Sequence, residues 1–540
     1  MDSPGRKERC YKLLGQASAA EDRPRQTAEL LPTAGTHTGV SRAVSLRALP
    51  AFSALTACVL LAAGCKPVGP DYKRPQFTAP DAYKETGASN VVPPPTPATA
   101  NGGSWSTASP SDGMLKGKWW EAFNDPQLNS LEERIAAVNV SLKQAYDNYL
   151  AAKEQVKIAR AAFSPTLSAG PGYSRDRVSA HRPLIVPGQP VETTYNDFTL
   201  EGQASWEPDL WGQIRRTVEA ARAEAQSTNA QMANLELSLE SEMAEDYFDL
   251  RGMDEQAFLL KVDVVQLTDQ LDLTKRRRNG GVATEADVAQ AQTQLDQTKA
   301  QLVDVGIARA EYEHAIGTIA NYDLSKFEIA FDKLPMDLDP PKIPTGVPSQ
   351  LLERRPDIAQ AERQVAQANA QVGVAISAFY PNITLSGSGG FESTGAGVWF
   401  QGPSSLWSLG AQATELLIDG GRRKAVTRQA RDNFDASANG YKSTVFQAFN
   451  EVEDKLSDLR IEEQEEAAEH LAVGDAQHSL DVSNQRYKGG VTTYLEVLTA
   501  ENTLIQNQRT EAQLRSRRFA SSVELIRALG GGWDATQLPK

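Results

Sequence analysis

Two long runs of the chain combine a helical spacing of apolar residues with a complete lack of proline. They extend from Gln213 to Asn279 and from Arg422 to Lys488. At 1.5 Å per residue, a continuous helix over either run would reach roughly 100 Å. Each run ends in Gly-Gly-Val and is followed by a second helical stretch, so the glycines are expected to cap the first helix. The heptad-like spacing therefore predicts two antiparallel coiled-coil hairpins.

Four shorter segments alternate apolar and polar residues with a period of two. In the clearest of them, one strand face is formed by Phe198, Leu200, Gly202, Ala204 and Trp206. A second runs from Ile383 to Phe391, and weaker examples run from Leu167 to Tyr173 and from Trp407 to Ala413. Strands of about ten residues with one apolar face are typical of transmembrane barrels, although a soluble sheet with one wet face fits the alternation equally well.

The number of strands then restricts the architecture. A single-chain barrel needs at least about eight strands, and unpaired strand edges in lipid cost several kcal/mol for each backbone group. Four strands per chain therefore predict that several chains share one barrel. Three protomers would supply twelve strands, a width that leaves an aqueous lumen.

The second half of the sequence also resembles the first half. A shift of 209 places Leu271-Asp272 on Leu480-Asp481, and a shift of 216 places Phe163 and Pro165 on Phe379 and Pro381. A shift of 208 matches Gly212 to Gly420. This pattern predicts a tandem repeat of about 200 residues: repeat 1 over 126–330, a linker over 331–348, repeat 2 over 349–530 and a tail over 531–540. Each repeat is expected to open with a helix, roughly over 126–162 and over 349–378, and both helices stop before Phe-x-Pro.

The beginning of the chain reads as a targeting segment. Ala48–Gly64 is uncharged and follows Arg42 and Arg47, which is typical of a secretory signal peptide. It ends in Leu61-Ala62-Ala63-Gly64-Cys65, which resembles a bacterial lipobox. In signals of that kind the leader, here 1–64, is removed and the cysteine is acylated. Residues 1–40 precede a complete signal, as either an over-extended start or a long leader, and 65–125 is expected to be a lipid-anchored, extended arm.

Composition removes several classes of function. The 540 residues contain 55 Lys and Arg against 69 Asp and Glu, a net charge of −14, which argues against a nucleic-acid partner. Three cysteines and five scattered histidines form no zinc-ligand pattern. No motif for a serine hydrolase, zinc protease or phosphate loop occurs, so we expect neither an enzyme nor a cofactor other than the lipid on Cys65. The acidic run Glu462-Glu463-x-Glu465-Glu466 is expected to be a solvated helix face.

Several motifs together resemble one family, the TolC/OprM outer membrane efflux proteins, and more closely its NodT-type lipoprotein branch. The first are Val68-Gly69-Pro70-Asp71-Tyr72, Trp119-Trp120 and Phe123-Asn124-Asp125-Pro126-Gln127-Leu128. The most specific is Ile343-Pro344-x-Gly346-Val347-Pro348-Ser349-x-Leu351-Leu352-x-Arg354-Arg355-Pro356-Asp357-Ile358. Asp419-Gly420-Gly421-Arg422 and Arg486-Tyr487-x-x-Gly490 complete the set.

The resemblance implies a homotrimer in the outer membrane that extends into the periplasm, anchored by lipid. It implies a twelve-stranded barrel and a helical tunnel that serve as the exit duct of a tripartite efflux system. The implied partners are a periplasmic adaptor (membrane fusion) protein, an inner-membrane RND-type pump and outer membrane lipid. An exit duct for type I protein secretion is an alternative, and a periplasmic coiled-coil scaffold without a pore is another.

The resemblance also points to residues. The family's periplasmic gate falls on Tyr494, Leu495, Glu496 and Thr499, with Asp287 as the repeat mate of Glu496. Three Leu495 side chains would form an apolar constriction and three Glu496 carboxylates an acidic ring, while a solvated acidic helix face is the alternative. Family members often carry Asp where Thr499 stands, which questions a gate of paired aspartates.

The hairpin tips are the implied adaptor contacts, at Gly280, Gly281, Val282, Gly489, Gly490 and Val491. The adjacent basic run Lys275-Arg276-Arg277-Arg278 is either a docking patch or, as we expect, a solvated helix end. A second departure from the family pattern is Leu416, where the family often has the proline that Pro208 supplies in repeat 1.

Overall fold

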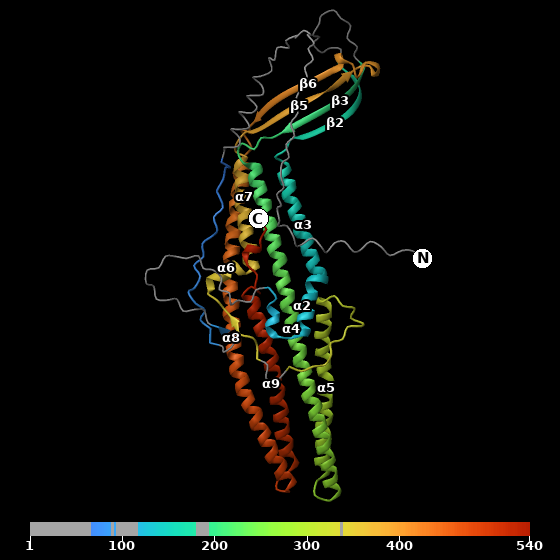
Figure 1. The fold of residues 1–540 in the computed structure, drawn as a ribbon, viewed down its shortest axis with the longest axis vertical. Coiled ribbons are helices and arrows are strands. Elements are labelled where there is room, and N and C mark those ends of the chain that lie inside the picture. Colours follow the sequence, from blue (N-terminus) through green and yellow to red (C-terminus); the bar gives the residue numbers. More distant parts are fainter. Residues whose placement is uncertain (1–65, 88–90, 93–116, 180–193, 335–338, 540) are drawn as a thin grey trace, which may run out of the picture. The chain divides into compact units, whose positions relative to one another are not determined.

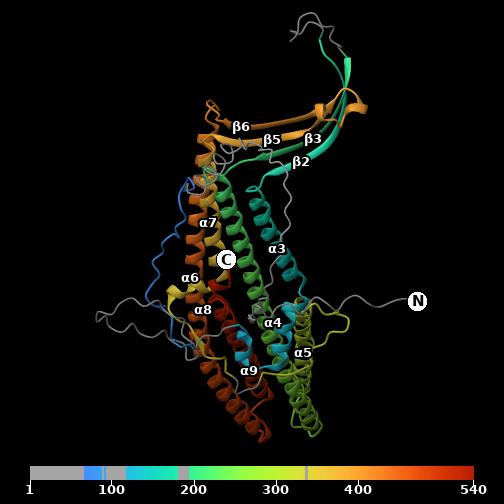
Figure 2. The ribbon, with the colours of Figure 1, turned by 45° about the horizontal axis from the view of Figure 1, so that its top comes forward.

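The computed structural model describes residues 66–87, 91–92, 117–179, 194–334 and 339–539 (Figure 1). Cys65 and the leader lie outside these residues, as does most of the stretch from 88 to 116. Within the described part, long helices run side by side and a four-stranded sheet lies at one end of them (Figures 1 and 2). No helix in those ranges is both long enough and apolar enough to span a membrane.

Helices dominate the described residues. The α-helices are α2 (Pro126–Val138), α3 (Val140–Ala161), α4 (Gln213–Asn279), α5 (Glu285–Ile319), α6 (Leu351–Arg354), α7 (Pro356–Ser377), α8 (Arg422–Lys488) and α9 (Tyr494–Ala528). Short 3-10 helices are η1 (Trp119–Phe123), η2 (Pro348–Gln350), η3 (Ala396–Val398), η4 (Gly402–Ser404) and η5 (Ala535–Gln537). The strands are β1 (Val91–Val92), β2 (Thr166–Arg177), β3 (Thr194–Trp206), β4 (Ile343–Pro344), β5 (Asn382–Ser393) and β6 (Ser405–Thr414).

The four long strands form an antiparallel sheet in the order β2-β3-β5-β6. Thr166 pairs with Ser205, Trp206 pairs with Leu385, and Asn382 pairs with Thr414. β2 and β6 are the edges: among the described strands, β2 pairs only with β3 and β6 pairs only with β5. The predicted strands are therefore correct in position, and the sheet is open within one chain.

The helices lie in the same lateral order as the strands. Next to the sheet, α3 packs on α4, α4 on α7, and α7 on α8. Toward the hairpin tips, α5 packs on α4, α4 on α9, and α9 on α8. Each layer is thus a row of four helices with α8 at one edge, and with α3 or α5 at the other.

The two halves match element by element. α3 and α7 each have 22 residues, α4 and α8 have 67, and α5 and α9 have 35. The offset is 216 for the first pair and 209 for the other two pairs. Gly212 and Gly421, both with positive φ, are the residues that precede α4 and α8, so the 208-residue match of Gly212 to Gly420 is off by one.

The opening helix of each repeat is shorter than predicted. In repeat 1, Asn139 (ψ 126°) breaks the expected helix into α2 and α3, because its side chain accepts the Leu142 amide as an N-cap. Its amide group also donates to the Ile319 carbonyl at 2.9 Å. In repeat 2, Pro356 opens α7, and extended Arg355 precedes it, as the residue before a proline must avoid helical geometry.

The arm and the linker share a core with the helices. β1 in the arm pairs in parallel with β4 in the linker. The Phe123 ring contacts that of Phe248 at 4.9 Å, and Phe248 stacks on Phe519 at 4.8 Å, which joins the arm to α4 and α9. Each buried aromatic ring contributes a few kcal/mol of apolar burial. The described part of the arm therefore packs against the helices.

Candidate functional site

The tips of the two hairpins are built by the same turn. Gly281 (φ 75°) and Gly490 (φ 74°) occupy the left-handed conformation after α4 and α8. Val282 N–H donates to the Arg277 carbonyl and Val491 N–H donates to the Arg486 carbonyl, both at 2.9 Å. These bonds define a Schellman motif, which closes a helix with glycine because L-residues with a Cβ are strained there.

Each tip presents an apolar side chain to solvent. Val282 is 66% exposed and Val491 is 72% exposed. Neither Gly281 nor Gly490 has any atom within contact distance of the place where a Cβ would stand. Both predicted tips are therefore exposed turns.

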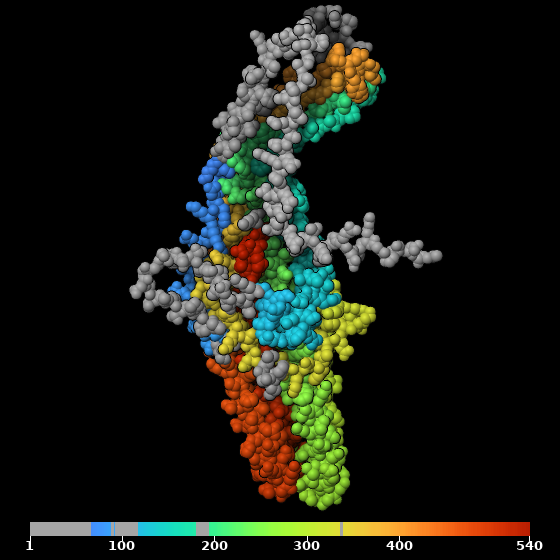
Figure 3. Space-filling model, in the orientation of Figure 1, coloured from blue at the N-terminus to red at the C-terminus, as the bar shows by residue number. Residues whose placement is uncertain are grey.

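The tips also contact each other inside one chain. The Arg277 guanidinium lies 4.4 Å from the centre of the Tyr487 ring and donates to the Lys488 carbonyl at 3.3 Å. Arg277 is thus part of an inter-hairpin contact rather than a fully solvated helix end, contrary to the expectation for this member of the basic run. Figure 3 shows the two hairpins side by side at this end of the molecule.

The predicted gate residues divide into buried and exposed groups. Tyr494 is 1% exposed and packs against Tyr487, with ring centres 5.6 Å apart. Leu495 is 56% exposed, and Thr499 is exposed and donates its hydroxyl to the Leu495 carbonyl at 2.8 Å. The first two turns of α9 therefore carry the Tyr494 side chain into the hairpin core and those of Leu495 and Thr499 onto its surface.

The two acidic gate candidates have different local roles. Asp287 accepts the amide and the hydroxyl of Thr284 at 2.7 and 2.8 Å, which forms a capping box at the start of α5. Glu496 instead pairs with Arg486 at 2.8 Å and accepts a hydrogen bond from Thr492. Thr493, the repeat mate of Thr284, makes no side-chain cap. Glu496 is therefore held by side chains that bridge the tip, whereas Asp287 stabilises its own helix.

A buried acidic pair lies where α4 meets α9. Asp263 and Glu501 are 6% and 7% exposed, and one carboxylate oxygen of each has no hydrogen-bond partner. Burial, reinforced by Asp263, raises the pKa of Glu501 to about 7. Burial raises the pKa of Asp263 to about 6, and Arg509 opposes that rise. We therefore expect the α4–α9 contact to respond to protonation near neutral pH.

Salt bridges between acidic residues of α8 and arginines of α9 join the two helices. Arg517 pairs with Glu462 at 2.9 Å and with Glu465 at 2.6 Å, while Arg518 pairs with Glu466. Glu462 is only 6% exposed. The expectation of a solvated acidic face is thus wrong for this residue, because the antiparallel partner helix supplies arginines.

The sheet end of the helices holds the first described residues of the arm. Val68 N–H donates to the Trp211 carbonyl at 3.0 Å. The Arg216 side chain is 4% exposed, donates to the carbonyls of Val68 and Gly69 and pairs with Asp71 at 2.9 Å. The motif after the lipobox is therefore clamped at the junction of sheet and helices.

Sequence reasoning missed four of these groups: the Arg277–Tyr487 contact, the Asp263–Glu501 pair, the Arg216 clamp and the ion pairs between α8 and α9. The α8–α9 pairs left one trace in the sequence, an acidic cluster over 462–466 and an arginine cluster over 515–518, but the sequence does not show that these two faces meet. Among the described residues, no group of three His, Cys, Asp or Glu side chains is arranged to hold a metal ion.

Known proteins share this sequence and fold. The model of the family described as outer membrane efflux protein matches residues 132–321 and 347–531. The pyoverdine export outer membrane protein OpmQ of Pseudomonas aeruginosa is 30% identical over 435 residues, which cover 79% of this chain and 90% of that protein. The outer membrane protein OprJ of Pseudomonas aeruginosa is 28% identical over 491 residues, covering 90% and 97%.

The fold agrees with a solved channel. The structure of the outer-membrane channel OprN has a TM-score of 0.76 and 26% identity, over 86% of this chain and 99% of that one. The matches include both hairpins and all four long strands. The chain therefore belongs to the outer membrane efflux protein family and is an outer membrane efflux channel protein.

Proposed function

We propose that three copies of this chain close into one duct, which forms the exit of a tripartite efflux system. The observation that carries the proposal is the open row of elements. β2 and β6 end the sheet, and the helices end with α3 or α5 on one side and with α8 on the other. A head-to-tail contact between unlike edges generates a ring when the rotation closes, and three copies give twelve strands.

The exposed apolar side chains of the sheet support a membrane location. Leu167, Trp407 and Leu409 are 80%, 77% and 81% exposed on one face. A contiguous apolar surface of this kind is unfavourable in water and suits lipid. The opposite face, with Gln203, Ser388 and other polar residues, would line the lumen.

The edge helices support closure of the periplasmic part. On α5, Val303 and Ile307 are 76% and 60% exposed, and they lie one turn apart. On α8, Ile461 and Leu471 are 50% and 70% exposed. In the proposed ring these two edges face each other, so their apolar residues become buried between copies.

The duct acts by passage and not by catalysis. The tips around Val282 and Val491 would receive the periplasmic adaptor, and an RND-type inner-membrane pump would deliver small molecules through it. Leu495 and Glu496 would narrow the periplasmic end. No cofactor is required, apart from lipid on Cys65.

The clamped arm supports that lipid anchor. Val68 is held at the sheet end of α4, and three residues of extended chain reach at most about 11 Å. A lipid on Cys65 would therefore lie close to the base of the sheet, on the periplasmic side of the membrane, where the helices lie.

The test is a native mass of the protein extracted in detergent from outer membranes, followed by conductance in planar bilayers. Three acylated chains starting at Cys65, with pores whose leak increases in Leu495→Ala, are the expected results. A monomer without conductance contradicts the duct, and unchanged leak in both Leu495→Ala and Glu496→Ala removes these residues from the gate.

A further inference from the structure

We propose that Arg175 and Arg177, at the end of β2 away from the helices, bind the phosphate groups of lipid in the outer leaflet of the outer membrane. The inference rests on the duct proposed above, because it needs the apolar face of the sheet to lie in lipid. It goes further, because it assigns a headgroup contact to two named side chains. The lipid is an anionic glycolipid of the lipopolysaccharide type, whose phosphates lie next to its acyl chains.

The charged residues of the sheet are sorted by sign onto its two faces. Side chains alternate between the faces along each strand, so the register fixes the face of every residue. In the four long strands, the charged residues of the polar face are all acidic: Asp176, Asp197, Glu201 and Glu392. On the apolar face, which carries Leu167 and Tyr173, the charged residues of these strands are Arg175 and Arg177 alone. Both arginines therefore lie on the face opposite every acidic residue of the sheet.

Neither arginine has an anionic partner within the chain. Arg175 and Arg177 are exposed, and among the described residues none forms an ion pair or a side-chain hydrogen bond with either guanidinium. β6, the edge that the proposed ring brings beside β2, contains no charged residue, and neither does the loop over 394–404 that precedes it. That strand and loop of a neighbouring copy therefore offer no carboxylate to these arginines. Both guanidiniums remain available for an anion from outside the protein.

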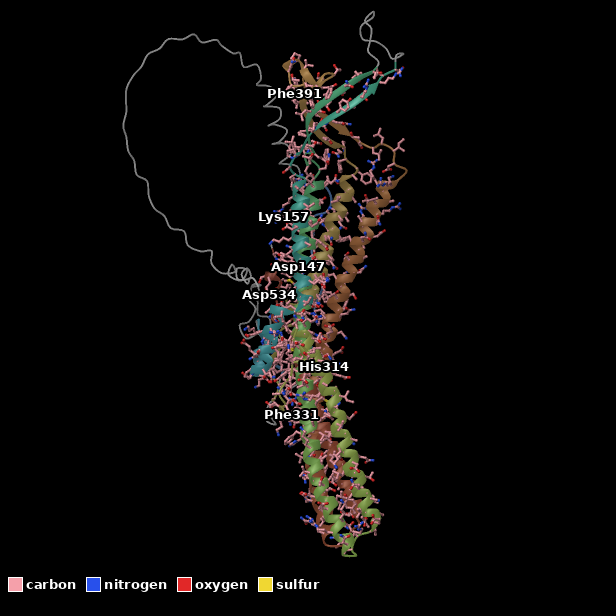
Figure 4. All side chains as sticks on the ribbon, turned by 90° about the vertical axis from the view of Figure 1, so that its right-hand side faces the viewer. Asp147, Lys157, His314, Phe331, Phe391 and Asp534 are labelled. Carbon is pink, nitrogen blue, oxygen red and sulfur yellow. The ribbon has the colours of Figure 1, made fainter. Side chains whose placement is uncertain are left out.

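A line of aromatic rings marks the membrane boundary next to the arginines. Five rings form the line: Tyr173, Phe198, Trp399, Phe400 and Phe391. In this order, successive ring centres are 5.0, 5.6, 4.8 and 5.7 Å apart. Figure 4 shows Phe391 in the part of the sheet that lies away from the helices. Since aromatic side chains concentrate where a membrane meets water, this line indicates the level of the outer interface.

The length of β2 places the arginines at the same boundary. β2 begins at Thr166, on the side where α3 ends, and continues past Tyr173 to Arg175 and Arg177. At about 3.3 Å per residue and a tilt of about 40°, the two arginines lie roughly 23 and 28 Å above Thr166. The apolar band of a membrane barrel is about 25 Å tall. Arg175 and Arg177 therefore lie at its outer limit, where lipid headgroups begin.

The local chemistry suits a phosphate. Residues two apart on one strand face stand about 7 Å from each other, so both guanidiniums can reach the same phosphate. Each guanidinium presents paired N–H donors that match phosphate oxygens. On β3, Asn196 lies opposite Arg175, and its side-chain oxygen accepts the Tyr173 hydroxyl at 3.3 Å. This contact leaves the amide N–H groups of Asn196 as further donors for the anion.

The surface below the arginines favours lipid over a free anion. The same face of β2 continues toward the helices with Tyr173 and Leu167, which are 62% and 80% exposed. Acyl chains can cover these side chains while the headgroup of the same lipid meets the guanidiniums. A free phosphate ion gains nothing from an apolar surface. The arrangement of apolar and basic residues therefore matches the two ends of one lipid.

Native mass spectrometry of the detergent-extracted protein measures the contact. The probes are lipid A, the phosphorylated base of lipopolysaccharide, and the same lipid after removal of its phosphates. Arg175→Gln with Arg177→Gln should weaken the binding of lipid A roughly tenfold or more, because each surface arginine adds to the attraction of an anionic lipid. Binding of the dephosphorylated lipid should not change. Equal binding of lipid A by the original protein and the double variant overturns the inference.

Two matched variants control for local damage and for net charge. Asp176→Asn alters a charge between the two arginines, but on the opposite face of β2. Arg276→Gln removes the same charge as Arg175→Gln from an exposed position near the tip of the first hairpin. Neither control should lower the binding of lipid A. A loss as large in Arg276→Gln as in Arg175→Gln would assign the binding to net charge and overturn the site.

The unaltered protein provides a test that needs no variant. It should bind lipid A more tightly than the dephosphorylated lipid, and inorganic phosphate at an equal concentration should not displace lipid A. Equal affinity for the two lipids overturns the phosphate contact. Displacement by inorganic phosphate would show a simple anion site and overturn the assignment to lipid.

The outcomes separate this inference from the proposed function. The double variant should keep the native mass of three chains and the original conductance, because its changes lie outside the lumen. Such a protein with undiminished binding of lipid A overturns the headgroup site and leaves the duct intact. For the original protein, a native mass of one chain without conductance overturns both, because the apolar face would then not lie in lipid.

Discussion

Helices α4 and α8 have the same length and the same tip, but they are buried to very different extents. Of 67 residues each, α4 buries 25 residues and α8 buries 13. α4 lies in the middle of the row, in contact with α2, α3, α5, α7 and α9, whereas α8 packs on α7 and α9. The difference shows that position in the row, and not the helix itself, decides what is buried, and that α8 has surface left for a partner.

The largest effect is expected when a charge is placed at equivalent positions of α4 and α8, which tests the difference in burial between the two helices. Ala230 on α4 is fully buried, and its mate Asn439 on α8 is exposed. Ala230→Glu should lose more than about 3 kcal/mol of unfolding free energy, because a buried charge without a partner is strongly destabilising. Asn439→Glu should leave the chain folded. Circular dichroism melts of both proteins in detergent measure the difference, and equal melts contradict it.

The buried acid on α9 should make one hairpin contact depend on pH. Folding raises the pKa of Glu501 from its ordinary 4.5 to about 7, so the folded state binds the proton more tightly. Stability is therefore highest below about pH 4.5 and falls as the pH rises to about 7, by about 3 kcal/mol. Hydrogen exchange of α4 and α9 amides at pH 5 and pH 7.5 measures this loss of stability.

Matched variants sharpen that test. Glu501→Gln should reduce the pH dependence of amide protection and leave the smaller part that Asp263 contributes, since burial still raises the pKa of the Asp263 carboxyl. Gln292→Glu, at the less buried equivalent position on α5, should introduce a much weaker dependence. An undiminished dependence in Glu501→Gln would assign it to another group.

The tip glycines should respond alike in the two hairpins. Gly281→Ala and Gly490→Ala both force a Cβ into the left-handed region, which costs roughly 1–2 kcal/mol each. Hydrogen exchange of the last turns of α4 and α8 should show similar losses of protection. Unequal losses would indicate that the two turns, despite equal geometry, carry different strain.

The smallest expected effect distinguishes the first turns of α5 and α9, which differ in their N-terminal caps. Thr284→Ala removes the capping box of α5 and should cost about 1 kcal/mol. Thr493→Ala should cost much less, because Thr493 makes no side-chain cap at the start of α9. Hydrogen exchange of the first turns of α5 and α9 compares the fraying of the two helices. Equal fraying would show that the capping box formed with Asp287 does not stabilise α5.

Local sequence signals predicted the long elements well. The bounds of α4 and α8 follow from proline-free runs that end in Gly-Gly-Val, and the period of two located all four long strands. These signals are local: backbone geometry and side-chain alternation act over a few residues. The breaks at Asn139 and Arg355 were missed, because capping and the residue before a proline act against otherwise strong helix formers.

The sequence by itself determined the elements, the internal repeat and, through motifs, the family. Only the tertiary structure decided the order of strands and helices, and therefore which elements are edges. It also decided that Glu462 is paired and that Asp263 and Glu501 are buried together. Residues more than 50 positions apart meet only after long helices pack, and no local pattern encodes which faces of two amphipathic helices come into contact.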